Sequence, residues 1–265
     1  MKKLFLLGLA FLLMPALVFA NGAPETNVDN SLQEVLDKGV FVLGLDDAFP
    51  PMGFRNADDE IVGFDIDLAT EVTKRLGVEL KCQPIDWNSK EQELSTGNID
   101  CIWNGFSVSE ERKKVIQFSQ TYLENFQILV VKGDSKVQSK KDLVGKVVGL
   151  QGGSTSQDAL ESDKEFENSL KQVVQFKDNM TALMDLETGG VDAVLMDMVV
   201  ANYNIQQTEK NFRILPDTFT KEDYAVGFRK SDTKLAEAVN NAFEAMKKDG
   251  TMAEIRSKWF KNDIK

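Results

Sequence analysis

The feature that most constrains this chain is a repeated alternation of apolar runs with amphipathic stretches. The first round starts with the apolar run "VFVLGLD" at residues 40–46. It continues with "IDLATEVTKRLG" at 66–77, where apolar residues recur near a 3.6-residue period and a glycine ends the pattern. The run "VELKCQPI" follows at 78–85, then a polar helical stretch at 89–97 and the run "IDCIWNG" at 99–105. This strand–helix–strand order predicts an α/β fold with a mostly parallel sheet and right-handed connections.

A second round of the same alternation follows. It comprises a strand and a glycine-rich turn within residues 139–161, and further strands at 170–176 and 191–197 that helices separate. Extended apolar runs at 125–134 and 223–232 stand before and after it. Two extended crossings imply that a second lobe is inserted into the first. We therefore expect lobe 1 at residues 31–126 and 225–265 and lobe 2 at 127–224, with a hinge strand at each end of lobe 2.

The first twenty residues are expected to be absent from the mature protein. Two lysines follow the first methionine, an apolar run extends from Leu4 to Phe19, and small residues end at Ala20. This pattern predicts a secretory signal peptide cleaved after Ala20, and the polar residues 21–30 predict a disordered leader. An uncleaved anchor is the weaker alternative, because the run is short for a bilayer. No cysteine follows the cleavage position to carry a lipid, so we expect a periplasmic protein.

The composition excludes several classes of function. The formal net charge is −11 and no basic stripe is present, which excludes nucleic-acid binding through counterion release. The chain has no histidine, which removes Ser-His-Asp and Cys-His catalysis and argues against a zinc or copper site. We expect a monomer that uses no metal and no other cofactor.

The two cysteines raise the question of a disulfide in an exported chain. Cys82 and Cys101 lie in two runs that should both flank the first strand rather than pair with each other. Strands separated by one intervening strand lie roughly 10 Å apart, which is beyond the reach of a disulfide. We expect two buried free thiols, with a bridge as the alternative.

Polar and aromatic residues gather at the carboxyl ends of the predicted strands. In the first lobe these ends are residues 46–49, 86–87 and 104–107, and in the second they are residues 151–156 and Asp197. In open α/β sheets, ligands bind off the carboxyl ends of the strands. We therefore expect these segments to converge on one crevice.

Arg112 is the first candidate binding residue. It falls in the first turn of a predicted helix capped by Ser109, where a cation gains nothing from the helix dipole. A guanidinium meets a carboxylate with two parallel hydrogen bonds, so we expect Arg112 to hold the carboxylate of a small ligand. The alternative is a surface arginine paired with Glu110 or Glu111.

The turn "QGGSTSQDAL" is the second candidate. Its glycines allow close approach of the backbone, and Ser154 or Thr155 can cap the following helix, whose N-terminus is an anion site. The alternative is an ordinary strand-to-helix turn. The turn is not a phosphate-binding Walker loop, because the lysine of that motif is absent.

Asp197 is a carboxylate at the end of an apolar strand. A buried charge must be paired, and we expect the ammonium group of the ligand to be the partner. The alternative is an N-cap for the helix predicted at 198–207. A cation site and an anion site in one crevice together describe a zwitterion.

A side-chain pocket is expected beside these two sites. Phe49 and Trp87 can sandwich a ligand side chain, with lobe core as the alternative for both. Three polar residues stand at the same rim, Asp46, Asp47 and Asn104. We expect them to bind the ligand side chain, and Asp46 is the first candidate among them.

These stretches resemble the bacterial extracellular solute-binding proteins of family 3, the polar amino-acid-binding subunits of ABC importers. The resemblance covers nearly the whole mature chain and is most specific in "GFDIDL" and "SVSEERKKVIQFS". It implies a two-lobed type II periplasmic-binding fold, closure of the lobes around an L-amino acid, and delivery to the permease subunits of an ABC importer.

The resemblance also implies how a zwitterion is held. It assigns the α-carboxylate to Arg112 together with main-chain groups at Ser107 and Thr155. It assigns the α-ammonium to Asp197, helped by the Asn104–Gly105 backbone and by Ser107.

The same resemblance places Asp46, Phe49 and Trp87 around the ligand side chain, with Gln151 entering from the second lobe. Three departures bear on the ligand. Asn104 stands where many relatives carry Ser or Ala, Gln151 stands where some glutamine binders carry Lys, and Phe49 lacks a tyrosine hydroxyl. The acidic and aromatic residues suit a cationic side chain such as arginine or lysine, whereas Asn104 and Gln151 suit an amide equally well. We expect a polar, and by preference basic, L-amino acid.

Two other functions compete with transport. Some periplasmic cyclohexadienyl dehydratases resemble this family, and such an enzyme needs a general acid in the pocket. Without histidine that acid would be a carboxyl group, but Asp46 and Asp197 already have binding roles, so we expect no catalysis. A sensory role, in which the ligand state is presented to a receptor, uses the same pocket.

Overall fold

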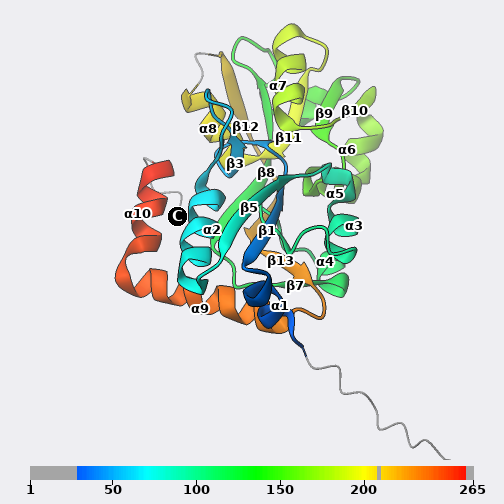
Figure 1. Cartoon of the computed structure of the whole chain (residues 1–265). Helices are drawn as coiled ribbons and strands as arrows, with labels where there is room; N and C mark the ends of the chain where they lie inside the picture. The colour runs from blue at the N-terminus through cyan, green and yellow to red at the C-terminus, as the bar shows by residue number, and fades with distance from the viewer. Residues whose placement is uncertain (1–28, 208–209, 261–265) are drawn as a thin grey trace, which may run out of the picture.

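The computed structural model describes residues 29–207 and 210–260 (Figure 1). The expected signal peptide and residues 21–28 of the expected leader lie outside the described residues. Asp29, which we had assigned to the leader, belongs to the folded part, because its carboxylate accepts a 2.7 Å hydrogen bond from the backbone N–H of Lys234. Within the described ranges, no helix is both long and apolar enough to span a membrane.

The protein has two lobes, each built on a five-stranded sheet. The first sheet has the order β5-β1-β6-β13-β7, and only β13 runs against the other four strands. This is the mostly parallel sheet that the alternating pattern predicts. Its strands are β1 (Val40–Leu45), β5 (Glu79–Pro84), β6 (Cys101–Ile102), β7 (Ile116–Phe118) and β13 (Gly227–Arg229).

The second sheet repeats this arrangement with the order β10-β9-β11-β8-β12, in which only β8 runs against the rest. The long strands β8 and β12 pair with each other, from Leu123 opposite Tyr224 to Lys132 opposite Phe212. Strand β8 covers most of the first extended run expected at 125–134. Strand β12 ends at Tyr224 and shares only residues 223–224 with the second run expected at 223–232, whose later part forms β13 of the first sheet. The strands are β8 (Leu123–Lys132), β9 (Val147–Gln151), β10 (Gln172–Phe176), β11 (Ala193–Asp197) and β12 (Phe212–Tyr224).

Helices cover both sheets. In Figure 1, α2, α9 and α10 gather on one side of the first lobe, while α3 and α4 lie on the other. The first-lobe helices are α1 (Ser31–Lys38), α2 (Phe64–Leu76), the 3₁₀ turn η1 (Trp87–Ser89), α3 (Lys90–Ser95), α4 (Glu110–Val115), α9 (Thr233–Asp249) and α10 (Thr251–Trp259). The second-lobe helices are η2 (Lys140–Leu143), α5 (Thr155–Ser162), α6 (Lys164–Ser169), α7 (Asn179–Thr188) and α8 (Met198–Gln207).

A small third sheet was not predicted. It consists of β2 (Ala48–Phe49), β3 (Gly53–Arg55) and β4 (Ile61–Val62), all antiparallel. Strands this short leave no periodicity to read in a sequence, and the paired prolines between β2 and β3 indicated only a turn. The sheet places Phe49 at the cleft.

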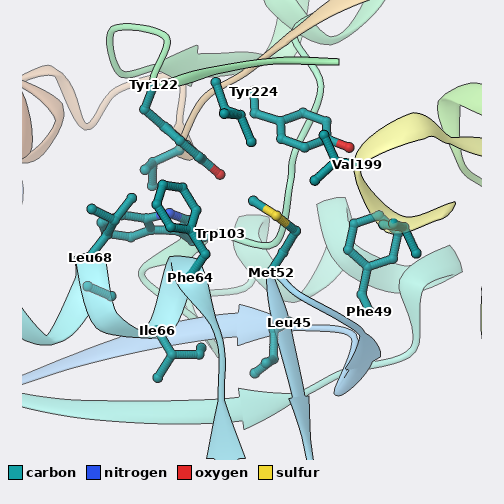
Figure 2. Packing of buried hydrophobic residues seen from close by; sticks show 14 of the residues in the cluster. Leu45, Phe49, Met52, Phe64, Ile66, Leu68, Trp103, Tyr122, Val199 and Tyr224 are labelled. Atoms are coloured by element: carbon teal, nitrogen blue, oxygen red, sulfur yellow. The ribbon is translucent and has the colours of Figure 1, made fainter. Parts of the chain in front are cut away.

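The core behind the cleft is rich in large side chains. Figure 2 shows Met52 between Tyr224 and Leu45, with Phe49 to one side. Met52, Leu45 and Tyr224 are completely buried. Burying side chains of this size contributes about 1.5–3 kcal/mol each. This packing fixes the strand ends from which the candidate site is built.

Cys82 and Cys101 are both free thiols, as predicted, but only Cys101 is buried, and Cys82 is partly exposed on the edge strand β5. Leu43 of β1 is the neighbour of Cys82 in β5 on one side and of Cys101 in β6 on the other. The central strand therefore separates the two sulfurs, which is the arrangement that the sequence indicated.

Candidate functional site

One cavity gathers the residues that the strand ends predicted. Its lining is drawn from both lobes and comprises Asp46, Phe49, Trp87, Asn104, Gly105, Ser107, Arg112, Gln151, Ser154, Thr155 and Asp197. Asp47 does not line it, although we had placed that residue at the rim. The Asp47 carboxylate instead accepts a 2.6 Å hydrogen bond from Nε of Arg55.

Arg112 supplies a cation to this cavity. The hydroxyl of Ser109 caps α4 by accepting from the backbone N–H of Arg112 at 3.2 Å, as predicted. The guanidinium donates to the carbonyl of Ser107 at 2.9 Å and lies 4.4 Å from the centre of the Phe106 ring. Burial lowers the pKa of Arg112.

The alternative interpretation of Arg112, a surface pair with a neighbouring glutamate, is wrong. Glu110 pairs with Lys113 at 2.7 Å and Glu111 pairs with Lys114 at 2.6 Å. Among the described residues, no carboxylate oxygen lies within 4.0 Å of the Arg112 guanidinium in an ion pair. A partly buried cation without a counterion is costly, so this wall of the cavity favours an anion.

Asp197 supplies the opposite charge. Its Oδ1 accepts hydrogen bonds from Asn125 at 2.7 Å, Gln127 at 3.0 Å and the Tyr224 hydroxyl at 2.7 Å. Burial, with the negative charge of Glu222 nearby, raises the pKa of Asp197 to about 7. These donors are all neutral, so they satisfy the oxygen without neutralising the charge.

Asp197 had an alternative role as the N-cap of α8. The backbone N–H of Val199 in the first turn donates at 3.3 Å to the side-chain oxygen of Asn125. A side chain from β8 thus accepts the hydrogen bond from the first turn of α8, and Asp197 lines the cavity.

Asp46 and Gln151 meet across the two lobes. Nε2 of Gln151 donates to Oδ2 of Asp46 at 2.7 Å, and the same nitrogen donates to the carbonyl of Lys177 at 3.0 Å. Burial raises the pKa of Asp46 to about 6, although hydrogen bonds from Ala48 and Gln151 oppose the shift. Both residues lie where the sequence placed them, one at the end of β1 and the other at the end of β9.

Gly105 occupies a turn that requires glycine. Its φ is +56°, and a Cβ atom there would lie 2.9 Å from the Phe49 ring and 3.0 Å from the Tyr224 ring. Its N–H donates at 2.6 Å to the carboxylate of Asp65, whose pKa burial raises to about 7. Asp65 lies in the "GFDIDL" stretch, and its part in holding this turn could not be read from the sequence.

The side chain of Asn104 links the strand ends of the first lobe. Its Oδ1 accepts from the backbone N–H of Asp46 at 3.2 Å. Its Nδ2 is buried and has no hydrogen-bond partner among the described residues. This nitrogen lies against the backbone of Gly53, where a Cβ atom would lie 2.7 Å from it.

Ser154 does not cap α5 as expected. It occupies the N-cap position, but its hydroxyl donates back to the carbonyl of Gln151 at 2.7 Å. Thr155 opens the helix, and its hydroxyl lies 3.3 Å from the hydroxyl of Ser107 in the first lobe. The glycine-rich turn therefore brings the second lobe against the first.

Phe49 and Trp87 belong both to the cavity and to the hydrophobic core. Each is nearly buried and packs in a core cluster. The Trp87 ring makes an edge contact with Phe106, at 6.0 Å between ring centres. Phe49 and Trp87 are therefore both part of the cavity wall and part of the lobe core, so the two roles considered in the sequence analysis do not exclude each other.

Four polar residues around the cavity were missed. Asn125, Gln127 and Glu222 come from the hinge strands β8 and β12 and surround Asp197 or the hydroxyls beside it. Lys90, on α3, is 3% exposed and donates to the carbonyl of Gly153 in the second lobe at 2.9 Å. In the sequence Lys90 and Glu222 stand in charged stretches that are typical of surface, whereas Asn125 and Gln127 stand at the start of the extended apolar run 125–134. Among the described residues, no cluster of acidic, cysteine or histidine side chains could hold a metal ion.

A two-lobed α/β fold with a charged cavity between its lobes defines a class of hinged ligand-binding proteins. Residues 41–262 match the model of the bacterial extracellular solute-binding proteins, family 3, and the chain belongs to this family.

Individual proteins agree with this assignment. The chain is 32% identical to the L-cystine-binding protein TcyJ of Escherichia coli, over 88% of this chain and 87% of that protein. It is 33% identical to the ABC transporter glutamine-binding protein GlnH of Bacillus subtilis, over 99% of both chains. A solved ABC uptake transporter substrate-binding protein from Streptococcus pneumoniae with bound histidine superposes with a TM-score of 0.86, at 38% identity, over 90% of this chain and 99% of that one.

Proposed function

We propose that this protein binds a polar L-amino acid between its two lobes and delivers it to an ABC importer. One observation carries the proposal: a cation without a counterion, Arg112, and a buried carboxylate, Asp197, line the same cavity. An α-carboxylate matches the first group and an α-ammonium matches the second. Binding requires no catalytic group, because the difference in affinity between the open and closed states drives closure.

Membership of the family supports a location and a partner for this protein. We infer that the chain is cleaved after Ala20, acts in the periplasm as a monomer and docks on the permease subunits of the importer. The apolar run that ends at Phe19 and the names of the family members support this inference. Mass spectrometry of the exported protein tests the cleavage position.

The residues expected around the ligand side chain favour a ligand with a polar side chain, and a basic side chain is the first candidate. Asp46 offers a carboxylate to a cation, and Phe49 and Trp87 offer ring faces. Asn104 and Gln151 line the same cavity, and their amide groups suit an amide side chain. The relatives named above bind cystine, glutamine and histidine, so membership of the family does not determine which amino acid this protein binds.

The test is a thermal-shift screen of the mature protein, refolded to remove carried-over ligand, against the common L-amino acids and prephenate. A ligand that binds only the native state stabilises it by roughly 2.7 kcal/mol at a hundredfold excess over Kd. Shifts with arginine and lysine support a basic pocket, and shifts with glutamine support an amide pocket. If no amino acid raises the melting temperature, the proposed function is wrong.

We propose no catalysis. The two carboxylates that line the cavity are Asp46 and Asp197, and both are assigned here to the binding of ligand groups, which leaves no separate general acid in the lining. Prephenate turnover by the purified protein would instead identify a dehydratase. Comparing uptake with chemotaxis in a deletion strain separates transport from a sensory role.

A further inference from the structure

Glu222 lies behind the cavity at the junction of the two lobes. It belongs to hinge strand β12 and is 6% exposed. One of its oxygens, Oε2, accepts from Ser107 Oγ at 2.7 Å and from Thr155 Oγ1 at 3.1 Å. Ser107 comes from the first lobe and Thr155 from the second, and both residues line the cavity.

These bonds decide what the two hydroxyls can offer a ligand. A hydroxyl has one proton and two lone pairs. When the proton of each hydroxyl points at the Glu222 carboxylate, only lone pairs remain for the cavity. Ser107 and Thr155 then act as acceptors toward a ligand, and an acceptor matches an ammonium group rather than a carboxylate.

The carboxylate of Glu222 shares two amide donors with the carboxylate of Asp197. Nδ2 of Asn125 donates to Asp197 at 2.7 Å and to Glu222 at 3.3 Å. Nε2 of Gln127 donates to the same two carboxylates at 3.0 and 3.1 Å. An amide nitrogen has two protons, so each amide can serve both acids at once, and Gln127 Nε2 also lies 3.3 Å from Thr155 Oγ1.

When both acids are deprotonated, the pair carries two negative charges without an ion-paired cation. Among the described residues, neither Asp197 nor Glu222 forms an ion pair with a lysine or arginine, and the side chains that donate hydrogen bonds to them are neutral. Two buried like charges repel each other, and a cation placed between or beside them relieves that repulsion. A monocationic amino group on the ligand is the complement that this arrangement lacks.

We propose that Glu222 is a positioning residue that makes the ammonium subsite selective for a charged amino group. It turns the hydroxyls of Ser107 and Thr155 into acceptors and adds a second negative charge behind Asp197. The proposal rests on the proposed function and deepens it. It implies that analogues with an α-hydroxyl in place of the α-amino group are rejected, because they bring no charge and only one proton.

The test compares amino acids with their hydroxy analogues. L-Arginine and argininic acid form one pair of probes, and L-histidine and imidazolelactic acid form a second, each measured by calorimetry on the mature protein at pH 8. We expect Glu222→Gln to raise the Kd of the amino acid at least about tenfold and to change the Kd of the hydroxy analogue less than about threefold. A residue with a merely structural role would weaken both probes alike, and that result would overturn the proposal.

Two further variants keep the test decisive. Glu124→Gln is the matched control, because Glu124 lies opposite Asp223 on the paired hinge strand and forms an exposed ion pair with Lys221. It should leave both affinities unchanged. If Glu222→Gln does not fold, Thr155→Val removes one of the two hydroxyls and should show the same selective loss, whereas an equal loss for both probes again overturns the proposal. If the wild-type protein binds neither amino acid nor any other in the screen, the proposed function itself fails.

Discussion

The side-chain amide of Gln151 donates a 2.7 Å hydrogen bond to the carboxylate of Asp46, and these two residues belong to different lobes. The bond lies in the cavity where the ligand side chain is expected. A ligand that reaches Asp46 therefore competes with Gln151 for the same oxygen or shares the carboxylate with it. This makes Asp46 the residue that best separates a basic from an amide ligand.

The first prediction concerns the charge of Asp46. We expect Asp46→Asn to raise the Kd of L-arginine about 10- to 100-fold, because a charge-assisted hydrogen bond contributes about 1.5–3 kcal/mol. The Kd of L-glutamine should change less than about threefold, because an asparagine still offers a neutral partner. Isothermal titration calorimetry measures both. Asp47→Asn, which removes a charge outside the cavity, is the control. An equal loss for the two ligands would refute the basic pocket.

The second prediction concerns the carboxylate site. Arg112→Ala should cost about 2 kcal/mol or more of binding free energy, which is roughly thirtyfold in Kd, because a buried ligand carboxylate loses its partner. The control is Lys113→Ala, which removes an exposed cation from the same helix. The thermal-shift screen would reveal an Arg112→Ala protein that keeps full affinity, and in that case the carboxylate site lies elsewhere.

The third prediction is a pH dependence of binding. The pKa of Asp197 is raised to about 7, and an ammonium binds its deprotonated form. As the pH falls below about 7, a growing share of the protein carries a proton on Asp197, which must leave before the ligand binds. The Kd of L-arginine should therefore be lowest near pH 8 and rise as the pH falls below about 7, and protonation of Asp46, whose pKa is raised to about 6, adds to the rise at the acid end.

Glu222 supplies the control for this profile. Its negative charge is one cause of the raised pKa of Asp197. Glu222→Gln removes that charge, so the break in the profile should move to lower pH, even though the variant binds more weakly. Calorimetry between pH 5.5 and pH 9 measures both profiles. A Kd that does not vary across this range would mean that Asp197 does not receive the ammonium.

The cavity lining shows how far a sequence can predict a site. Apolar runs separated by amphipathic stretches predicted the strands, and the carboxyl ends of parallel strands meet at one edge of a sheet. Asp46, Asn104 and Gln151 could therefore be placed together before any distance was known, and all three line the cavity. The free thiols followed from the same strand order.

The polar partners behind the cavity could not be predicted in this way. Lys90 and Glu222 stand in stretches of charged residues, which are typical of solvent-exposed surface. Their burial results from the approach of one lobe to the other, and no local pattern records such an approach. The same holds for Ser154, whose position predicted a helix cap but whose hydroxyl bonds to Gln151. Alternative local hydrogen bonds of a serine are close in energy, so tertiary context decides between them.

The last prediction concerns Lys90, which joins the lobes without lining the cavity. Its ammonium donates to the carbonyl of Trp87 in its own lobe at 3.1 Å and to that of Gly153 in the other lobe at 2.9 Å. Nearby, a Cβ atom at Gly153 would lie 2.8 Å from the side chain of Asn88, so the two lobes are in close contact here. The Lys90–Gly153 bond can form only when the lobes are closed, and we expect it to stabilise that state.

We therefore expect Lys90→Met to speed the dissociation of the ligand about tenfold, since a hydrogen bond from a charged donor contributes about 1.5 kcal/mol or more. The association rate should change little, because ligand enters the open state, where this bond is absent. Stopped-flow fluorescence measures both rates, with Trp87 as a reporter beside the contact. Lys114→Met, which alters an exposed ion pair on α4, should leave both rates unchanged. A Lys90→Met protein with slower association and unaltered dissociation would show that Lys90 acts on ligand entry and does not hold the lobes closed.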